Sequence, residues 1–252
     1  MNLNYIPFSL LHLNARSINH NLTNLTDCLT TINHTFTIIG ITETWLYNRD
    51  QNSDYINISG YNFFQESRDD RSGGGIGLFI KSNINFKQRK DIAVFDSQSI
   101  ESLFIEIMRP NQKNAIIGII YRPSSADLSL FMDNLNSILS KFTKEQNDCY
   151  LVGDFNIDLL KYQQHTSTND FLDVMYSNSL LPMINRPSRI TSHATCIDNI
   201  FSICSTQSYQ LFNALFLTDI SDHLPILSII FQQSNNQTKC TTEAKRQTNN
   251  PN

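Results

Sequence analysis

Length, composition and charge describe a folded protein that is acidic overall. The 252 residues include 40% hydrophobic and 17% charged side chains, with a formal net charge of −4 and a pI near 5.8. This length fits one domain with a sizeable core. The charge argues against a tight, nonspecific nucleic-acid binder, whose affinity comes mainly from lysine and arginine.

The cysteines and the apolar runs indicate the cellular compartment of the protein. Five cysteines, odd in number and without Cys-X-X-Cys spacing, favour a reduced intracellular protein, nuclear or cytoplasmic, with no zinc site. The N-terminus carries no signal-peptide pattern, and no apolar run reaches the roughly eighteen residues of a membrane span. We therefore expect no membrane partner. We also expect a monomer.

Apolar runs in the first half of the chain predict strands, with one helix between the first two. Residues 8–14 form a strand candidate, and apolar residues recur at helical spacing over 18–32. Further strands are predicted at 37–42, 61–65, 76–80, 100–108 and 115–121. Only the short loop 109–114 separates the last two, so they should pair as an antiparallel hairpin.

The second half alternates strands with two helices. Asp127 is placed to cap a helix whose apolar residues extend over 128–139, and another helix is predicted at about 169–178. Strands are predicted at 149–152, 197–203, 211–217 and 226–231. Without a regular βαβ repeat, this order predicts an α+β fold of two mixed sheets packed together, with helices outside.

The apolar pattern stops at Phe231. From Gln232 onward Asn, Gln, Thr and Lys dominate, as in linkers that cannot form a core. We therefore predict a folded domain over residues 1–231 and a disordered polar tail or linker over 232–252.

Five polar clusters stand at the ends of predicted strands, where they could meet at one site. They are Asn14, Glu43, Tyr121, the pair Asp154 and Asn156, and the pair Asp222 and His223. Carboxylates with a histidine suit metal-assisted attack on a phosphodiester, which needs a hard cation held by oxygen and a positioned water. Oxygen ligands favour Mg²⁺ or Mn²⁺ over zinc.

Each of these residues also has a purely structural explanation. Taken alone, Glu43 fits a solvated loop, Tyr121 an aromatic at a strand end, and the pair Asp154 and Asn156 an ordinary turn. The triple glycine at 73–75 is interpreted as a hairpin turn, because no helix follows it. The remaining histidines have no carboxylate beside them in the chain and are predicted to be structural: His12, His20, His34, His165 and His193.

Six short motifs carry a family resemblance. They are LNARS at 13–17, ITETWL at 41–46, YRP at 121–123, GDFN at 153–156, IDNIF at 197–201 and SDHLP at 221–225. In this order they resemble the endonuclease/exonuclease/phosphatase family, above all the apurinic-like endonuclease domain of non-LTR retrotransposons of the jockey or chicken-repeat type. The resemblance implies a four-layer α/β/β/α sandwich of two mixed, mainly antiparallel sheets, a divalent metal, usually Mg²⁺, and phosphodiester hydrolysis.

The resemblance also implies roles for the residues around the metal and the attacking water. Glu43 matches the metal-binding glutamate, with support from Asn14 and Asp222. Asp154 would orient or deprotonate the water, and Asn156 would bind the water or a phosphate oxygen.

Further roles concern the phosphate and the transition state. Asp198 matches the aspartate that hydrogen-bonds the imidazole of His223, which would stabilise the transition state. Tyr121, together with Asn14, would contact the phosphate. Arg122 and Arg189 are added as candidates for substrate binding.

The retroelement resemblance predicts an endonuclease that nicks duplex DNA and leaves a 3′-hydroxyl to prime copying. A reverse-transcriptase domain or element RNA would be a partner outside this chain. Two departures from the repair enzymes stand out: Ser124 replaces an asparagine, and Arg16, common in the retroelement group, replaces an acidic or amide residue. An inositol-phosphate phosphatase and an inactive binding module remain alternatives.

Overall fold

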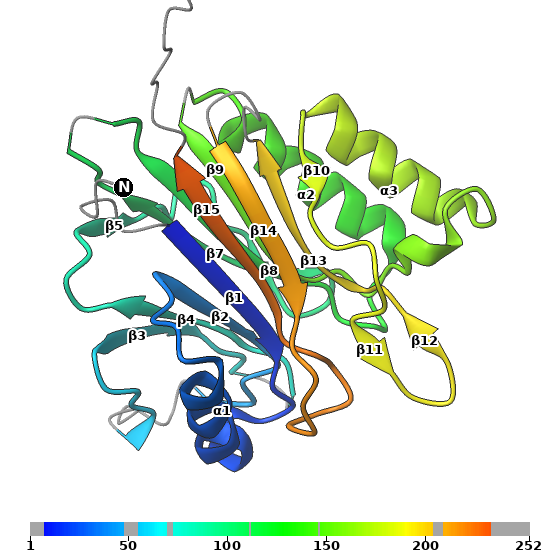
Figure 1. Cartoon of the computed structure of the whole chain (residues 1–252). Helices are drawn as coiled ribbons and strands as arrows, with labels where there is room; N and C mark the ends of the chain where they lie inside the picture. Colours follow the sequence, from blue (N-terminus) through cyan, green and yellow to red (C-terminus); the bar gives the residue numbers. More distant parts are fainter. Residues whose placement is uncertain are drawn as a thin grey trace, which may run out of the picture.

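The computed structural model describes residues 8–47, 55–69, 73–110, 112–145, 147–203 and 209–232 (Figure 1). The predicted tail lies outside the described residues apart from Gln232, the last residue of a strand. Among the described helices, none is both long and apolar enough to cross a membrane.

The first sheet has six strands in the order β14-β15-β1-β2-β4-β3. β1 pairs in parallel with β2 and antiparallel with β15. The bounds are β1 Phe8–Asn14, β2 Ile38–Thr42, β3 Tyr61–Glu66, β4 Ile76–Lys81, β14 Tyr209–Leu215 and β15 Ile226–Gln232.

The second sheet follows the order β10-β13-β9-β8-β7-β5, with β6 paired to β7. The predicted hairpin is confirmed, because β7 and β8 pair antiparallel. β8 and β9 are parallel. The bounds are β5 Phe86–Gln88, β6 Phe95–Asp96, β7 Ile100–Ile107, β8 Ala115–Tyr121, β9 Asp148–Asp154, β10 Leu181–Pro182 and β13 Asp198–Ile203.

Helices cover the outer faces of the two sheets, which confirms the predicted α/β/β/α sandwich (Figure 1). α1 (Ile18–Ile32) packs on the first sheet, while α2 (Leu128–Phe142) and α3 (Thr166–Ser177) pack on the second. Asp127 caps α2 as predicted, since its side chain accepts a hydrogen bond from the amide of Leu130. A short 3-10 helix, η2 (Leu159–Lys161), follows β9.

The apolar core explains why central strands such as β8 are hydrophobic on both faces. Ile117 and Ile119 face the core between the sheets, whereas Ile116 and Ile120 face the core under α2 and α3. Strands buried on both faces need apolar side chains at successive positions. Gly118 interrupts the run because a Cβ there would lie 2.2 Å from the ring of Phe104.

Several element boundaries differ from the sequence expectations. α3 begins at Thr166 rather than near 169, and β14 ends at Leu215 rather than 217. The short strands β5, β6 and β10, and the hairpin of β11 (Arg189–Ile190) with β12 (Ala194–Thr195), were not predicted. Strands of two or three residues carry too little periodicity to be found, and their pairing partners create them.

The strand pairing brings the polar clusters to one edge of the sandwich. The ends of parallel β1 and β2 lie together, with Asn14 opposite Thr42, and the ends of β8 and β9 match in the same way. Antiparallel β13 starts at this edge, because Asp198 pairs with Asp154. The segment before β15 also arrives here, since Ile226 pairs with His12.

Candidate active site

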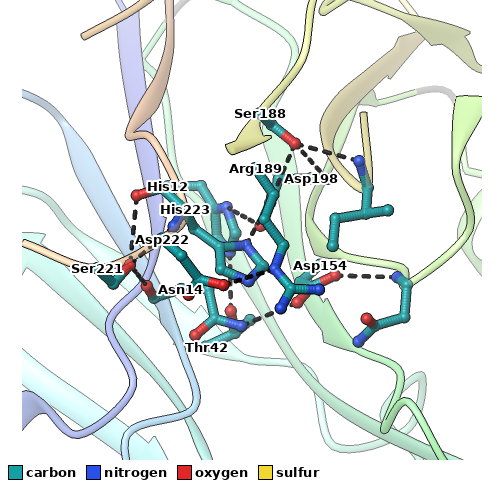
Figure 2. Close-up of polar contacts among 12 residues, drawn as sticks. His12, Asn14, Thr42, Asp154, Ser188, Arg189, Asp198, Ser221, Asp222 and His223 are labelled. Atoms are coloured by element: carbon teal, nitrogen blue, oxygen red, sulfur yellow. Dashed lines mark hydrogen bonds and ion pairs between the residues drawn. The ribbon is translucent and has the colours of Figure 1, made fainter. Parts of the chain in front are cut away.

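Asn14 joins the two sheets at the centre of the site (Figure 2). Its Nδ2 donates to Oε1 of Glu43 at 2.8 Å and to Oδ2 of Asp154 at 2.9 Å. Both carboxylates therefore lie within hydrogen-bonding distance of one nitrogen atom. Asn14 holds the predicted metal ligand and the predicted base side by side.

The loop after β2 fixes Glu43 in a strained conformation. Glu43 and Trp45 have φ values of 52° and 55°, in the left-handed region that non-glycine residues rarely adopt. The amides of Thr44 and Trp45 donate to the carbonyls of Gly75 and Gly74 at 3.1 and 2.9 Å. The glycine turn before β4 thus supports the loop that carries Glu43.

Trp45 is a site residue that the sequence interpretation missed. Its indole Nε1 donates to Oε2 of Glu43 at 3.1 Å, while 41% of the residue stays exposed. Each oxygen of Glu43 therefore accepts one hydrogen bond, and a carboxylate oxygen has a second lone pair that can bind a cation. The adjacency of both residues within one motif was the signal that could have revealed this contact.

Asp154 is fully buried at the end of β9. Burial and the nearby charge of Asp198 raise its pKa to about 7. Its Oδ1 accepts a hydrogen bond from the amide of Asn156 at 2.9 Å. A carboxylate with a pKa near neutrality suits proton transfer from water.

Asn156 and Arg122 lock the loops after β9 and β8 together. Asn156 Nδ2 donates to the carbonyl of Arg122 at 2.8 Å, and the guanidinium of Arg122 donates back to the carbonyl of Asn156 at 3.2 Å. Arg122 also donates to the carbonyl of Ala126 and lies over the ring of Phe131. Arg122 is buried in loop contacts, and its predicted role in substrate binding stays a prediction.

His223 forms a buried pair with Asp198. Its Nδ1 lies 2.9 Å from Oδ2 of Asp198, the contact that the resemblance implies. Burial opposes the charged imidazolium, but the charges of Asp198, Asp154 and Asp222 outweigh it and raise the pKa of His223 to about 9. The histidine is therefore positively charged at neutral pH and can donate a proton or a hydrogen bond.

Ser188 supports this pair and was not predicted. Its Oγ donates to Oδ2 of Asp198 at 2.8 Å and accepts from the amide of Asp198 at 2.9 Å. Ser188 precedes the β11–β12 hairpin and has no motif around it. No sequence signal distinguished it from the other serines.

His12 lies near a carboxylate that its position in the chain did not reveal. It is fully buried, with Nδ1 3.8 Å from Oδ1 of Asp198 and Nε2 3.1 Å from Oγ1 of Thr42. The structural role expected for His12 stays a prediction, and the packing of the two sheets brings Asp198 close to it. Burial lowers the pKa of His12 to about 4, so this imidazole is neutral.

Asp222 faces two arginines. Its Oδ2 accepts from Nε of Arg189 at 2.7 Å, and its Oδ1 pairs with Nε of Arg16 at 3.0 Å. Burial alone would raise the pKa of Asp222, but the two arginines and His223 hold it below its usual range. Its support of the metal stays a prediction, while these contacts tie the hairpin to the site.

Tyr121 ends β8 beside the carboxylates. Burial and the charges of Glu43 and Asp154 raise the pKa of its phenol well above the usual range. The phenol therefore stays protonated at physiological pH. A protonated phenol can donate a hydrogen bond to a phosphate oxygen.

A divalent cation fits the chemistry of this site. Asp154, Asp198 and His223 each offer one ligand atom, and these atoms lie within 4.8 Å of one another. His223 Nδ1 is already bonded to Asp198, so the carboxylate oxygens of this edge fit a hard cation better than the imidazole does. Glu43 and Asp154 lie side by side on Asn14, and a hard cation with oxygen ligands would neutralise the negative charge that they concentrate there.

The larger described cavity does not coincide with this site. A cavity of about 690 Å³ lies at the opposite end of the sandwich, lined by residues at the start of β1 and the end of β7, including Phe8 and Ile107. It contains none of the predicted site residues. The chemistry, rather than the cavity volume, therefore locates the candidate active site.

The fold and the site define a class of two-sheet sandwich proteins with acidic and histidine residues at one edge. Residues 11–223 match the model of the Endonuclease/Exonuclease/phosphatase family. The chain belongs to this family, which confirms the resemblance drawn from the motifs. Comparison with curated proteins gives no match.

Solved structures share this fold. The endonuclease domain of TRAS1, a telomere-specific non-LTR retrotransposon, is 13% identical with a TM-score of 0.70, covering 91% of this chain and all of that chain. The AP endonuclease LMAP from Leishmania major is 11% identical with a TM-score of 0.67, covering 90% and 88%. A 3′ phosphatase, NExo, from Neisseria, bound to a product DNA hairpin, is 12% identical with a TM-score of 0.65, covering 88% and 98%.

Proposed function

We propose that this protein is a divalent-metal-dependent endonuclease that nicks duplex DNA and leaves a 3′-hydroxyl and a 5′-phosphate. The observation that carries the proposal is the contact of one Asn14 nitrogen with both Glu43 and Asp154, beside the charged pair of His223 and Asp198. The motifs of the retroelement group support DNA as the substrate. A reverse transcriptase or element RNA would then be the functional partner.

The chain supplies a base for the attacking water, a positive charge for the transition state, and hydrogen bonds to the phosphate. Asp154 accepts a proton from the attacking water, whose oxygen forms the new bond to phosphorus. The bond from phosphorus to the 3′ oxygen breaks, this oxygen takes up a proton from solvent water, and Asp154 returns its own proton to solvent. His223 donates to the oxygens that gain negative charge, and the phenol of Tyr121 binds a further phosphate oxygen.

Glu43 would hold the cation, with Asn14 and Asp222 nearby. When bound, a divalent cation would polarise the phosphate and stabilise the charge on the leaving oxygen. The ligand oxygens favour Mg²⁺, with Mn²⁺ as a substitute.

Two arginines at the rim favour a polyanionic substrate. Arg16 and Arg189 are partly exposed, with 44% and 30% of their side chains accessible, and Asp222 orients both. Fixed guanidinium groups suit phosphate recognition. Because arginine contacts to phosphates release counterions, we expect binding to weaken as the salt concentration rises.

The proposed activity has a direct test. Supercoiled plasmid incubated with protein and Mg²⁺ at low salt should be converted to nicked circles, and EDTA should abolish the conversion. The nicks should prime synthesis by a DNA polymerase without prior treatment, because the 3′ end is a hydroxyl. Nicking that continues in excess EDTA would exclude a metal-dependent mechanism.

The same preparation distinguishes the alternatives. Intact plasmid together with release of phosphate from an inositol phosphate would favour a phosphatase. Folded protein without either activity would favour a binding module.

The only tryptophan of the chain, Trp45, can report metal binding independently of activity. Because its indole donates to Glu43, titration with Mg²⁺ should change tryptophan emission, and paramagnetic Mn²⁺ should quench it. Glu43→Gln should remove the response. Glu145→Gln is the matched control, since Glu145 pairs with Arg89 in a separate network; an unchanged response in Glu43→Gln would place the cation elsewhere.

A further inference from the structure

His12 is the one imidazole besides His223 that approaches Asp198 among the described residues. His12 has no task in the proposed reaction, yet it lies fully buried on β1, close to the pair of Asp198 and His223 (Figure 2). A buried polar side chain costs free energy unless its groups are satisfied, so its presence requires an explanation.

The hydrogen bonds of Asp198 are unevenly distributed between its two oxygens. Oδ2 contacts both His223 Nδ1 and Ser188 Oγ. Oδ1 is buried and has no hydrogen-bond partner within the described part of the chain, and the same is true of Nδ1 of His12. These two atoms lie 3.8 Å apart, and a small side-chain rotation would bring them into hydrogen-bonding distance.

The neighbours of His12 select its tautomer. The ring of His12 is fully buried, with Oγ1 of Thr42 beside Nε2 and Oδ1 of Asp198 beside Nδ1. The hydroxyl of Thr42 lies 3.1 Å from Nε2 and can donate to it. That arrangement places the ring proton on Nδ1, where it faces the carboxylate oxygen that lacks a donor.

We propose that His12 is a positioning residue that extends the catalytic pair to a chain of four: Thr42, His12, Asp198 and His223. Thr42 donates to His12, His12 donates through Nδ1 to Oδ1 of Asp198, and Asp198 accepts from His223 through Oδ2. With both oxygens held, Asp198 cannot rotate about its terminal bond. His223 then keeps Nδ1 on Asp198 and directs Nε2 towards the phosphate.

This role rests on the proposed function for its kinetic consequence but not for its hydrogen bonds. His12→Phe keeps the size of the ring and removes both nitrogens. By analogy with the residues that orient metal-site ligands, kcat for nicking should fall about 10- to 100-fold, with KM unchanged. His12→Asn should restore part of the rate, because its amide nitrogen occupies nearly the position of Nδ1.

Double mutants separate positioning from a general structural effect. In a His223→Ala background, His12→Phe should cause no further loss of kcat, because the orientation that it supports is already absent. His34→Phe is the control, since His34 is a partly buried histidine that contacts Ser9 at the other end of the sandwich. Multiplicative losses in the double mutant, or wild-type kcat in His12→Phe, would overturn the proposal.

A second measurement does not depend on nuclease activity. The ring ¹⁵N signals of the histidines, assigned with His12→Phe, should show the His12 proton on Nδ1, and His12→Phe should also shift the ring signals of His223. A proton on Nε2, or unchanged His223 signals, would refute the positioning role even in a fully active enzyme. If no nuclease activity is found, the Nδ1 tautomer and the shifted signals would still support the hydrogen-bonded chain, while the proposed function alone would fail.

Discussion

Asp154→Asn is expected to lower kcat for nicking by about two to four orders of magnitude, the contribution typical of a general base. The substitution keeps the size of the side chain but removes its ability to accept a proton from water. Asp127→Asn is the matched control, because aspartate and asparagine cap helices about equally and Asp127 lies at the start of α2. Near-normal kcat in Asp154→Asn would assign the base to another residue.

The same substitution should change how stability depends on pH. Because the fold raises the pKa of Asp154 to about 7, the folded state holds the proton more tightly than the unfolded state. The resulting stabilisation is present below the unfolded pKa and disappears as the pH rises through about 7. Metal-free protein should therefore become less stable over this range, and Asp154→Asn should lose that part of the decline, as measured by urea unfolding.

His223→Ala is expected to lower kcat by about two to three orders of magnitude, because this is the typical cost of removing one group that stabilises charge in the transition state. Asp198→Ala should cost a similar factor, and the double mutant should lose little more than either single variant, because the two residues act as one unit. Strictly multiplicative losses would mean that Asp198 serves the fold and not the histidine.

The charged form of His223 gives this prediction a pH signature. The pKa of His223 is raised to about 9, so the imidazolium is present at neutral pH and is lost as the pH rises through about 9. In the wild type kcat/KM should fall over this range, and His223→Ala should lack the fall. His20→Ala, on the exposed face of α1, is the control and should retain wild-type activity and its pH profile.

The sequence determined most of the architecture and the outline of the site. The isoleucine-rich run of β8 was predicted as a strand, and Asp127 marked the start of α2 because its side chain caps the helix. Polar residues at strand ends predicted a site at one sheet edge. These inferences succeeded because they depend on local periodicity and on chemistry within a few residues of each position.

Only the tertiary structure decided which atoms meet. His12 approaches Asp198 because β1 and β13 belong to two sheets that face each other, and no spacing in the chain encodes that distance. The two arginines on Asp222 and the hydroxyl of Ser188 on Asp198 likewise come from segments far apart in sequence. Such contacts depend on how the sheets pack, and therefore on the summed burial of many side chains rather than on any local pattern.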